Sequence, residues 1–126
     1  MSPKPNILII EGDAYLAGLY ARKLELESCA VRVVDNLEDA RKKIKAKCPD
    51  AVVIDVAIEN KTGFDFVEEM KKKHGLGKVP VIVITQLGDR TSIEIALQKG
   101  ADDYLIKGHF VPQEAAKKIK RIAYDK

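Results

Sequence analysis

The sequence predicts a single α/β domain in which helices cover both faces of a parallel sheet of five strands. Short apolar runs rich in β-branched residues alternate with stretches whose apolar residues recur three or four positions apart. The connections between them are only a few residues long, as right-handed crossovers in a doubly wound sheet require. The length of 126 residues suits one hydrophobic core, so we expect one domain over residues 1–126 with a flexible tail over residues 1–5.

Five apolar runs mark the strands. Strands that are apolar along almost their whole length are typical of a parallel sheet buried between two layers of helices. Four runs are clear and a fifth, at residues 31–34, is weaker. The runs are Ile7–Ile10, Val31–Val34, Ala51–Ile54, Val79–Ile84 and Tyr104–Ile106.

Five stretches with helical spacing separate and follow these runs. Residues suited to helix ends flank them: Asp13 is placed to cap the first helix, Gly75 and Gly77 to close the third, Gly100 to end the fourth and Pro112 to open the fifth. The apolar positions that define the stretches are Leu16, Leu19, Tyr20 and Leu24; Leu37, Ala40 and Ile44; Phe64, Val67 and Met70; Ile93, Ala96 and Leu97; and Ala115, Ile119 and Ile122.

The composition narrows the function classes. A net charge of +3 is too small for the clustered basic surface of a nucleic-acid-binding domain, and the lysine runs at residues 71–73 and 117–121 fit solvated helix faces. No apolar run approaches the roughly 20 residues of a membrane span. Cys29 and Cys48 lack metal-ligand spacing and fit reduced thiols. We therefore expect a cytoplasmic protein that does not itself bind nucleic acid or a membrane.

Polar residues that carry chemistry follow four of the five runs. Glu11 and Asp13 follow the first run, and Asp55, Thr85 and Lys107 follow the third, fourth and fifth. Each alone fits a cap or a solvated strand end, but the carboxyl ends of parallel strands meet at one edge of the sheet. Together they predict a pocket where an aspartate attacks a phosphorus centre and a lysine and a hydroxyl hold the phosphoryl oxygens. Such hard oxygen ligands favour Mg²⁺.

At this point the chain resembles the receiver domain of two-component response regulators over almost its whole length. The resemblance implies a flavodoxin-like sheet of order 2-1-3-4-5 with five helices, and a signalling module rather than an enzyme. It rests on four segments in the family's order and spacing, which are residues 7–11, 49–55, 80–85 and 100–107.

The resemblance also implies a role for each site residue. Asp55 takes the place of the phospho-acceptor. Glu11, Asp55 and the backbone carbonyl of Ala57 take the places of the Mg²⁺ ligands, with Asp13 as a further candidate.

Three further residues match the family's switch. Thr85 and Lys107 take the places of the switch hydroxyl and the phosphate-binding lysine, and Tyr104 that of the aromatic switch residue. Taken without the resemblance, Thr85 reads as a β-branched strand residue and Tyr104 as an ordinary edge-strand tyrosine.

The chain departs from the family pattern at several positions. Gly12 stands where the second acid of the metal-binding pair is usual, so we expect Mg²⁺ to bind weakly unless Glu11 or Glu59 compensates. Gln86 replaces a small residue and narrows the expected access to Asp55. Gly108 replaces a proline, and because a cis peptide is costly before glycine, the loop that carries Lys107 is expected to follow another path.

Two hypotheses follow. The leading one is a receiver phosphorylated on Asp55 by a histidine kinase or a histidine phosphotransfer protein and read out on the face of its fourth helix, fifth strand and fifth helix. The alternative is a pseudo-receiver that binds partners without phosphorylation. The downstream reader is either a protein partner or an output domain outside this sequence, and the chain is expected to be a monomer or a phosphorylation-linked homodimer. A flavin module would need a phosphate-binding loop where Glu11 and Asp13 stand, and no nucleotide-binding P-loop is present.

Overall fold

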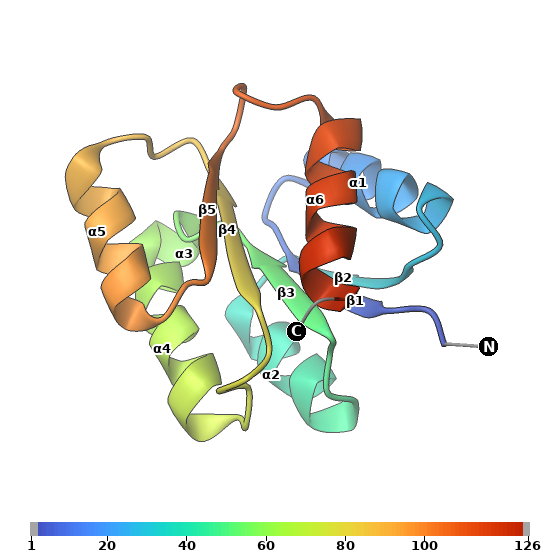
Figure 1. Ribbon diagram of the computed structural model, residues 1–126. Coiled ribbons are helices and arrows are strands. Elements are labelled where there is room, and N and C mark those ends of the chain that lie inside the picture. The colour runs from blue at the N-terminus through green and yellow to red at the C-terminus, as the bar shows by residue number, and fades with distance from the viewer. Residues whose placement is uncertain (1–2, 125–126) are drawn as a thin grey trace.

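The protein is a five-stranded parallel sheet with helices on both faces (Figure 1), in a computed structural model that describes residues 3–124. The strand order is β2-β1-β3-β4-β5, which confirms the predicted fold class and order. The strands are β1 (Asn6–Ile10), β2 (Ala30–Val34), β3 (Ala51–Ile54), β4 (Val81–Thr85) and β5 (Asp103–Ile106). The helices are α1 (Ala14–Leu26), α2 (Leu37–Ala46), α3 (Ile58–Lys61), α4 (Gly63–Lys73), α5 (Arg90–Lys99) and α6 (Pro112–Tyr124).

Each face of the sheet has its own apolar core, because successive strand residues point to opposite faces. Ile7 and Ile9 of β1 pack with α1 and α6, whereas Leu8 and Ile10 pack with α2, α4 and Ala96 of α5. Figure 1 shows α1 and α6 together on one side of the sheet and α4 and α5 on the other. The central strands are therefore buried on both sides, and polar groups are left to their ends.

The helix ends follow local sequence signals. Asp13 caps α1, with its Oδ1 accepting a hydrogen bond from the amide of Leu16 at 3.1 Å. Gly100 ends α5 at a φ of 115°, and Gly75 adopts a φ of 74° just after α4. Helix α6 begins at Pro112. These ends lie where the sequence predicts them.

Helix α3 is the one difference from the five predicted helices. This four-residue turn begins three residues after Asp55, and its Glu59 and Asn60 have left-handed backbone angles. Lys61 also has a positive φ of 69°. Such a turn has no apolar period to reveal it, so the sequence indicates only a loop there.

Residues 1 and 2 of the predicted flexible tail lie outside the described residues. Pro5 is buried, and its carbonyl accepts a hydrogen bond from the amide of Ala30 at 2.8 Å, which ties the end of the tail to β2. Cys29 is buried and Cys48 exposed, and both are free thiols. Between residues 3 and 124, no helix has both the length and the apolar character needed to cross a membrane.

Candidate functional site

The carboxyl end of the sheet holds a compact cluster of one ammonium and two carboxylates. Lys107 Nζ lies 2.7 Å from Glu11 Oε1 and 2.8 Å from Asp55 Oδ2. All three side chains are largely buried, with exposed fractions of 10%, 8% and 13% for Lys107, Glu11 and Asp55. Three residues from distant parts of the sequence therefore meet in one place, as the strand-end pattern predicts.

The sheet register explains why they meet. Strands β1 and β3 are neighbours, and the amide of Asp55 donates to the carbonyl of Ile10 at 3.0 Å, so Glu11 and Asp55 leave adjacent strands side by side. Lys107 leaves β5, two strands away from β3, and its amide donates to the carbonyl of Thr85 at 2.8 Å. A long lysine side chain is needed to reach across β4 to both carboxylates.

The electrostatics of the cluster are those of a buried ion pair. Burial alone would lower the pKa of Lys107, but its hydrogen bonds to Asp55 and Glu11 outweigh that effect and raise the pKa. Lys107 therefore carries its charge at neutral pH. With two carboxylates and one ammonium, the cluster has a formal net charge of −1.

Asp55 uses its second oxygen to order the loop that follows it. Its Oδ1 accepts a hydrogen bond from the amide of Ala57 at 2.9 Å. The backbone at Ala57 is therefore held next to the carboxylate. Asp55 itself stays partly accessible at the surface.

Thr85 and Tyr104 lie at the same edge of the sheet but do not contact the ion cluster directly. The Thr85 side chain is fully buried, and its Oγ1 accepts a 3.5 Å contact from the amide of Leu87. The Tyr104 hydroxyl donates to the carbonyl of Leu87 at 2.5 Å. Burial, with the nearby charges of Asp89 and Asp55, raises the pKa of Tyr104 to about 12. Both residues thus hold the loop between β4 and α5.

The two carboxylates predicted from the sequence as further metal ligands, Asp13 and Glu59, form hydrogen bonds elsewhere. Asp13 caps α1, and its own amide donates to Glu11 Oε2 at 3.1 Å. Glu59 accepts a hydrogen bond from the amide of Leu37 at 2.6 Å, which links the turn after Asp55 to the start of α2. Neither side chain joins Glu11 and Asp55 at Lys107.

The three departures from the family pattern lie around this cluster. A side-chain atom added at Gly12 would meet nothing within 4 Å, so a second carboxylate has room there. Gln86 is exposed, and the side-chain hydrogen bonds of Asp55 within residues 3–124 go to Ala57 and Lys107 rather than to Gln86. Gly108 adopts a φ of 89°, and the peptide bond before it is trans, yet the Lys107 ammonium still reaches both carboxylates.

Tyr20 is a site neighbour that the sequence indicates only as part of an apolar helix face. It is 7% exposed and belongs to the core beneath the cluster. Burial raises its pKa, opposed by the charge of Lys107 and reinforced by those of Glu11 and Asp55. Only the sheet geometry reveals this proximity, because Tyr20 has no motif of its own.

The donor set is compatible in kind with Mg²⁺. This ion is commonly bound through one or two carboxylates and keeps several of its waters. Glu11 and Asp55 supply two hard oxygen donors that converge on one point, now contacted by Lys107. Between residues 3 and 124, no group of three or more His, Cys, Asp or Glu side chains converges as a metal site. Glu11 and Asp55 are the two carboxylates that could hold the ion, and residue 12, a glycine, supplies none.

Comparison with known proteins identifies the family. The model of the response regulator receiver domain matches residues 7–120. The transcriptional regulatory protein KdpE of Staphylococcus aureus is 33% identical over 120 residues, which are 94% of this chain and 51% of KdpE. The probable transcriptional regulator ycf27 of Guillardia theta is 27% identical over 122 residues, 97% of this chain and 46% of that protein. The chain thus spans about half the length of these curated relatives.

Solved structures agree with the fold. A two-component response regulator from Clostridium difficile superposes with a TM-score of 0.86 at 26% identity, covering 96% of this chain and 97% of that one. HP1043, an orphan response regulator of H. pylori, gives a TM-score of 0.86 at 23% identity, covering 98% and 99%, and supports the fold alone. With the family match over residues 7–120, these findings show that the chain belongs to the response regulator receiver domain family.

Proposed function

We propose that this receiver domain is a phosphorylation switch in a two-component system and that Asp55 accepts the phosphoryl group. The observation that carries the proposal is the contact of Lys107 Nζ with both Glu11 Oε1 and Asp55 Oδ2. It holds a cation beside a partly accessible carboxylate, where negative charge builds up during phosphoryl transfer.

In the proposed reaction, a carboxylate oxygen of Asp55 attacks the phosphorus of the donor. A new oxygen–phosphorus bond forms as the bond from phosphorus to the leaving group breaks, and its electron pair departs with the leaving group. The leaving group is the imidazole nitrogen of a phosphohistidine or the carboxylate of a small acyl phosphate. The product is an acyl phosphate on Asp55.

Other residues of the chain support this step. Lys107 can exchange its contact with Asp55 Oδ2 for a phosphoryl oxygen while keeping Glu11, and the buried Thr85 hydroxyl lies one strand away from Asp55. Glu11, Asp55 and the carbonyl of Ala57 are the proposed holders of Mg²⁺, with Asp13 as a more distant candidate. When bound, the ion neutralises phosphoryl charge; we expect it to bind weakly because Gly12 supplies no carboxylate.

The proposed readout is the face formed by α5, β5 and α6. Tyr104 links the site to this face, since its hydroxyl bonds the Leu87 carbonyl in the loop that follows Thr85. If Thr85 turns towards a phosphoryl group, this loop moves and the Tyr104 contact changes. Ile95 and Leu97 of α5 are exposed apolar residues that a partner protein could contact.

The partners follow from this chemistry. A cytoplasmic histidine kinase or phosphotransfer protein supplies the phosphoryl group. The state of the α5–β5–α6 face is read either by a downstream protein or by an output domain. The curated relatives, which are about twice as long as this chain, have room for such a domain. The domain itself is a signalling module, not a metabolic enzyme, and phosphorylation shifts it from monomer towards homodimer through that face.

The test is intact mass measurement after incubation with acetyl phosphate and Mg²⁺. The wild type is expected to gain one phosphoryl group and Asp55→Asn none. Asp35→Asn is the matched control, because Asp35 follows β2 as Asp55 follows β3, while the ion pairs within the described part of the structure join Lys107 to Glu11 and Asp55 instead. An adduct that persists on Asp55→Asn would contradict the proposed acceptor.

A second candidate function is the pseudo-receiver, which binds partners without phosphorylation. Two observations favour it: Lys107 already neutralises much of the charge on Glu11 and Asp55, and residue 12 is a glycine. The pseudo-receiver would be favoured if neither the wild type nor Gly12→Asp, a variant meant to strengthen Mg²⁺ binding, gains a phosphoryl group.

A further inference from the structure

The two edge strands of the sheet, β5 and β2, differ in whether a side chain occupies their outward-facing backbone groups. At the β5 edge, the amide of Tyr104 donates to the side chain of Asp103 at 2.8 Å, and the other oxygen of Asp103 pairs with Lys118 at 3.3 Å. A charged residue that occupies edge amides in this way prevents another strand from pairing there. Edge strand β5 is thus protected by its own aspartate.

Edge strand β2 has no such protection. Its residues pair with β1 in continuous register, without a bulge, and the segment Ala30–Val34 contains no proline. Ala30 and Val34 bond to the β1 side, through the Ala30 amide to Pro5 and the Val34 carbonyl to Glu11. Because backbone groups alternate along a strand, those of Val31 and Val33 point away from the sheet.

The single charge in β2 does not guard this edge. Arg32 donates to Asn6 Oδ1 and to the carbonyls of Lys43 and Lys47, so its guanidinium is bound to the sheet and to the end of α2. Val33, in contrast, is 42% exposed. The edge therefore presents an apolar strand with backbone groups free to pair, the arrangement that favours addition of a strand.

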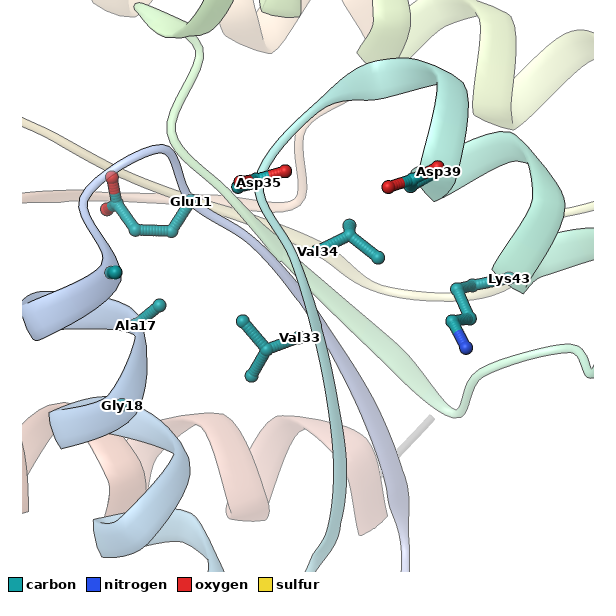
Figure 2. Close-up of a pocket in the computed structure, with 9 residues that line it drawn as sticks. Glu11, Ala17, Gly18, Val33, Val34, Asp35, Asp39 and Lys43 are labelled. Atoms are coloured by element: carbon teal, nitrogen blue, oxygen red, sulfur yellow. The ribbon is translucent and has the colours of Figure 1, made fainter.

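A groove of about 460 Å³ runs beside this edge, between α1 and α2. Figure 2 shows Val33 and Val34 of β2 between Ala17 of α1 on one side and Asp39 and Lys43 of α2 on the other. Ala14, Ala17 and Gly18 form the α1 wall, and a side chain added at Gly18 would meet nothing within 4 Å. Such small residues leave space for a second helix to approach α1.

The charges along the groove are arranged from acidic to basic. Asp35 and Asp39 lie towards the carboxyl end of β2, and Lys43 lies one turn further along α2. No ion pair within residues 3–124 joins Lys43 to a carboxylate, although Asp39 precedes it by four residues. An antiparallel copy of the same surface would bring its Lys43 against Asp39 and its Asp39 against Lys43.

We propose that this edge is a self-association surface on which two copies of the domain pair β2 with β2, antiparallel about a two-fold axis. The paired sheet would be continuous through both copies, and the α1 helices would approach each other over their small residues. A second copy fits better than a foreign strand because the surface is complementary to itself in both charge and apolar pattern. This pairing leaves the α5–β5–α6 face free and needs no phosphorylation.

Analytical ultracentrifugation of the unphosphorylated chain without Mg²⁺ tests the proposal over a range of concentrations. The wild type is expected to form a concentration-dependent dimer, and Val33→Lys to raise its dissociation constant by at least about tenfold, because a lysine protects an edge strand. Leu97→Lys on α5 is the matched control, with an exposed apolar residue changed in the same way, and should leave the dimer intact.

A charge exchange sharpens the test. Asp39→Lys and Lys43→Asp are each expected to weaken the dimer, and the double variant to restore it, because the exchanged charges again face each other across the two-fold axis. Amide hydrogen exchange at Val31 and Val33 should slow as the concentration rises. This readout would not respond to a mere change in stability.

Three outcomes would overturn the proposal. The first is a wild type that stays monomeric at every concentration. The second is a dimer that Leu97→Lys disrupts and Val33→Lys does not, which would assign pairing to the α5–β5–α6 face. The third is a monomer whose Val31 and Val33 amides shift only when a foreign extended peptide is added, which would give the edge a different occupant. None of these outcomes bears on whether Asp55 accepts a phosphoryl group.

Discussion

Two lysines are buried at opposite ends of the same sheet, and they differ in what surrounds their charge. Lys107, at the carboxyl end, is 10% exposed and forms ion pairs with the carboxylates of Glu11 and Asp55. Lys71, at the amino end, is 13% exposed and donates to the Val79 carbonyl at 2.6 Å and to Asp102 Oδ2 at 2.8 Å. The same side chain is thus placed in two different electrostatic settings.

The backbone makes the difference. The Asp102 oxygen that contacts Lys71 also accepts the amide of Val81 at 2.7 Å, so the pair at the amino end is built into the start of β4. At the carboxyl end, among the residues that the structure describes, the Lys107 ammonium has no backbone hydrogen-bond partner, and both of its partners are side chains. An ion pair fixed by backbone groups supports structure, whereas one between side chains alone can be exchanged for a ligand.

Replacing Lys107 by methionine should have the largest effect. It leaves Glu11 and Asp55 buried beside each other without a cation, which should lower the free energy of unfolding by about 3 kcal/mol at neutral pH. Denaturant unfolding measures the loss. Intact mass after acetyl phosphate treatment should also show no stable adduct, and a variant phosphorylated like the wild type would contradict the role given to this ammonium.

The pH dependence of the same variant follows from the sign of the shift. The pKa of Lys107 is raised above its ordinary 10.5, so its stabilisation is present below that value and is lost as the pH rises through the folded-state pKa. The wild type should therefore lose stability above about pH 10.5 more steeply than Lys107→Met. Parallel stability curves in alkali would show that the cluster contributes nothing.

Replacing Lys71 by methionine should cost less and leave the chemistry intact. The variant loses a hydrogen bond to Val79 and a contact to Asp102, and because Asp102 is 46% exposed, water can take the place of the ammonium. We expect a loss of about 2 kcal/mol in the free energy of unfolding. Phosphoryl incorporation per folded molecule should equal that of the wild type. If Lys71→Met folds but is not phosphorylated, the ion pair at the amino end is not purely structural and the proposed contrast with Lys107 is wrong.

The sequence predicts the carboxyl end better than the amino end, for a physical reason. Glu11, Asp55 and Lys107 follow apolar runs directly, and parallel strands bring such positions to one edge. Lys71 lies inside a lysine run that fits a solvated helix face, although the structure buries it against Asp102. Which lysine of a run is buried depends on helix rotation, and the pattern of apolar residues fixes that only approximately.

The fold was predictable for the same reason, and the loops were not. Periodicity and end signals locate all five long helices and the sheet order agrees with the resemblance. The turn over Glu59 and Asn60 depends on left-handed backbone angles in residues that are not glycine, for which the sequence has no signal. The partners of Asp13 and Glu59 likewise depend on neighbouring loops, so their proposed part in metal binding could not be judged in advance.

Adding a carboxylate at the carboxyl end should strengthen its capacity to bind a ligand. Gly12→Asp places a third acid near Glu11 and Asp55 in space where an added atom meets nothing within 4 Å. We expect the affinity for Mg²⁺ to rise about tenfold, or about 1.4 kcal/mol. Amide NMR titration with Mg²⁺ measures it. Gly18→Asp is the control, because an atom added at Gly18 on α1 also meets nothing within 4 Å, and it should leave the affinity for Mg²⁺ unchanged. If Gly12→Asp leaves the affinity unchanged as well, the glycine is not what limits Mg²⁺ binding.

The smallest effect should come from a charged contact between the helices α2 and α4, whose stabilisation is lost in acid rather than in alkali. Glu69 of α4 accepts Arg41 Nε at 2.6 Å and Nη2 at 2.9 Å, and its Oε2 lies 2.7 Å from His74 Nε2. Chiefly the hydrogen bonds from Arg41 lower the pKa of Glu69 from 4.5 to about 2. Because the folded-state pKa is depressed, the stabilisation is present above pH 4.5 and is lost as the pH falls towards 2.

Glu69→Gln should therefore lose about 1 kcal/mol of unfolding free energy at neutral pH, since the carboxylate is 23% exposed and solvent weakens the pair. Between pH 4.5 and 2 the wild-type and variant curves should converge. Glu68→Gln on the same helix is the control: its contacts with Lys72 and Lys99 are longer, at 3.3 Å and 3.8 Å, and their loss should cost less at neutral pH. Curves for the wild type and Glu69→Gln that stay parallel from pH 4.5 to 2 would contradict the lowered pKa of Glu69.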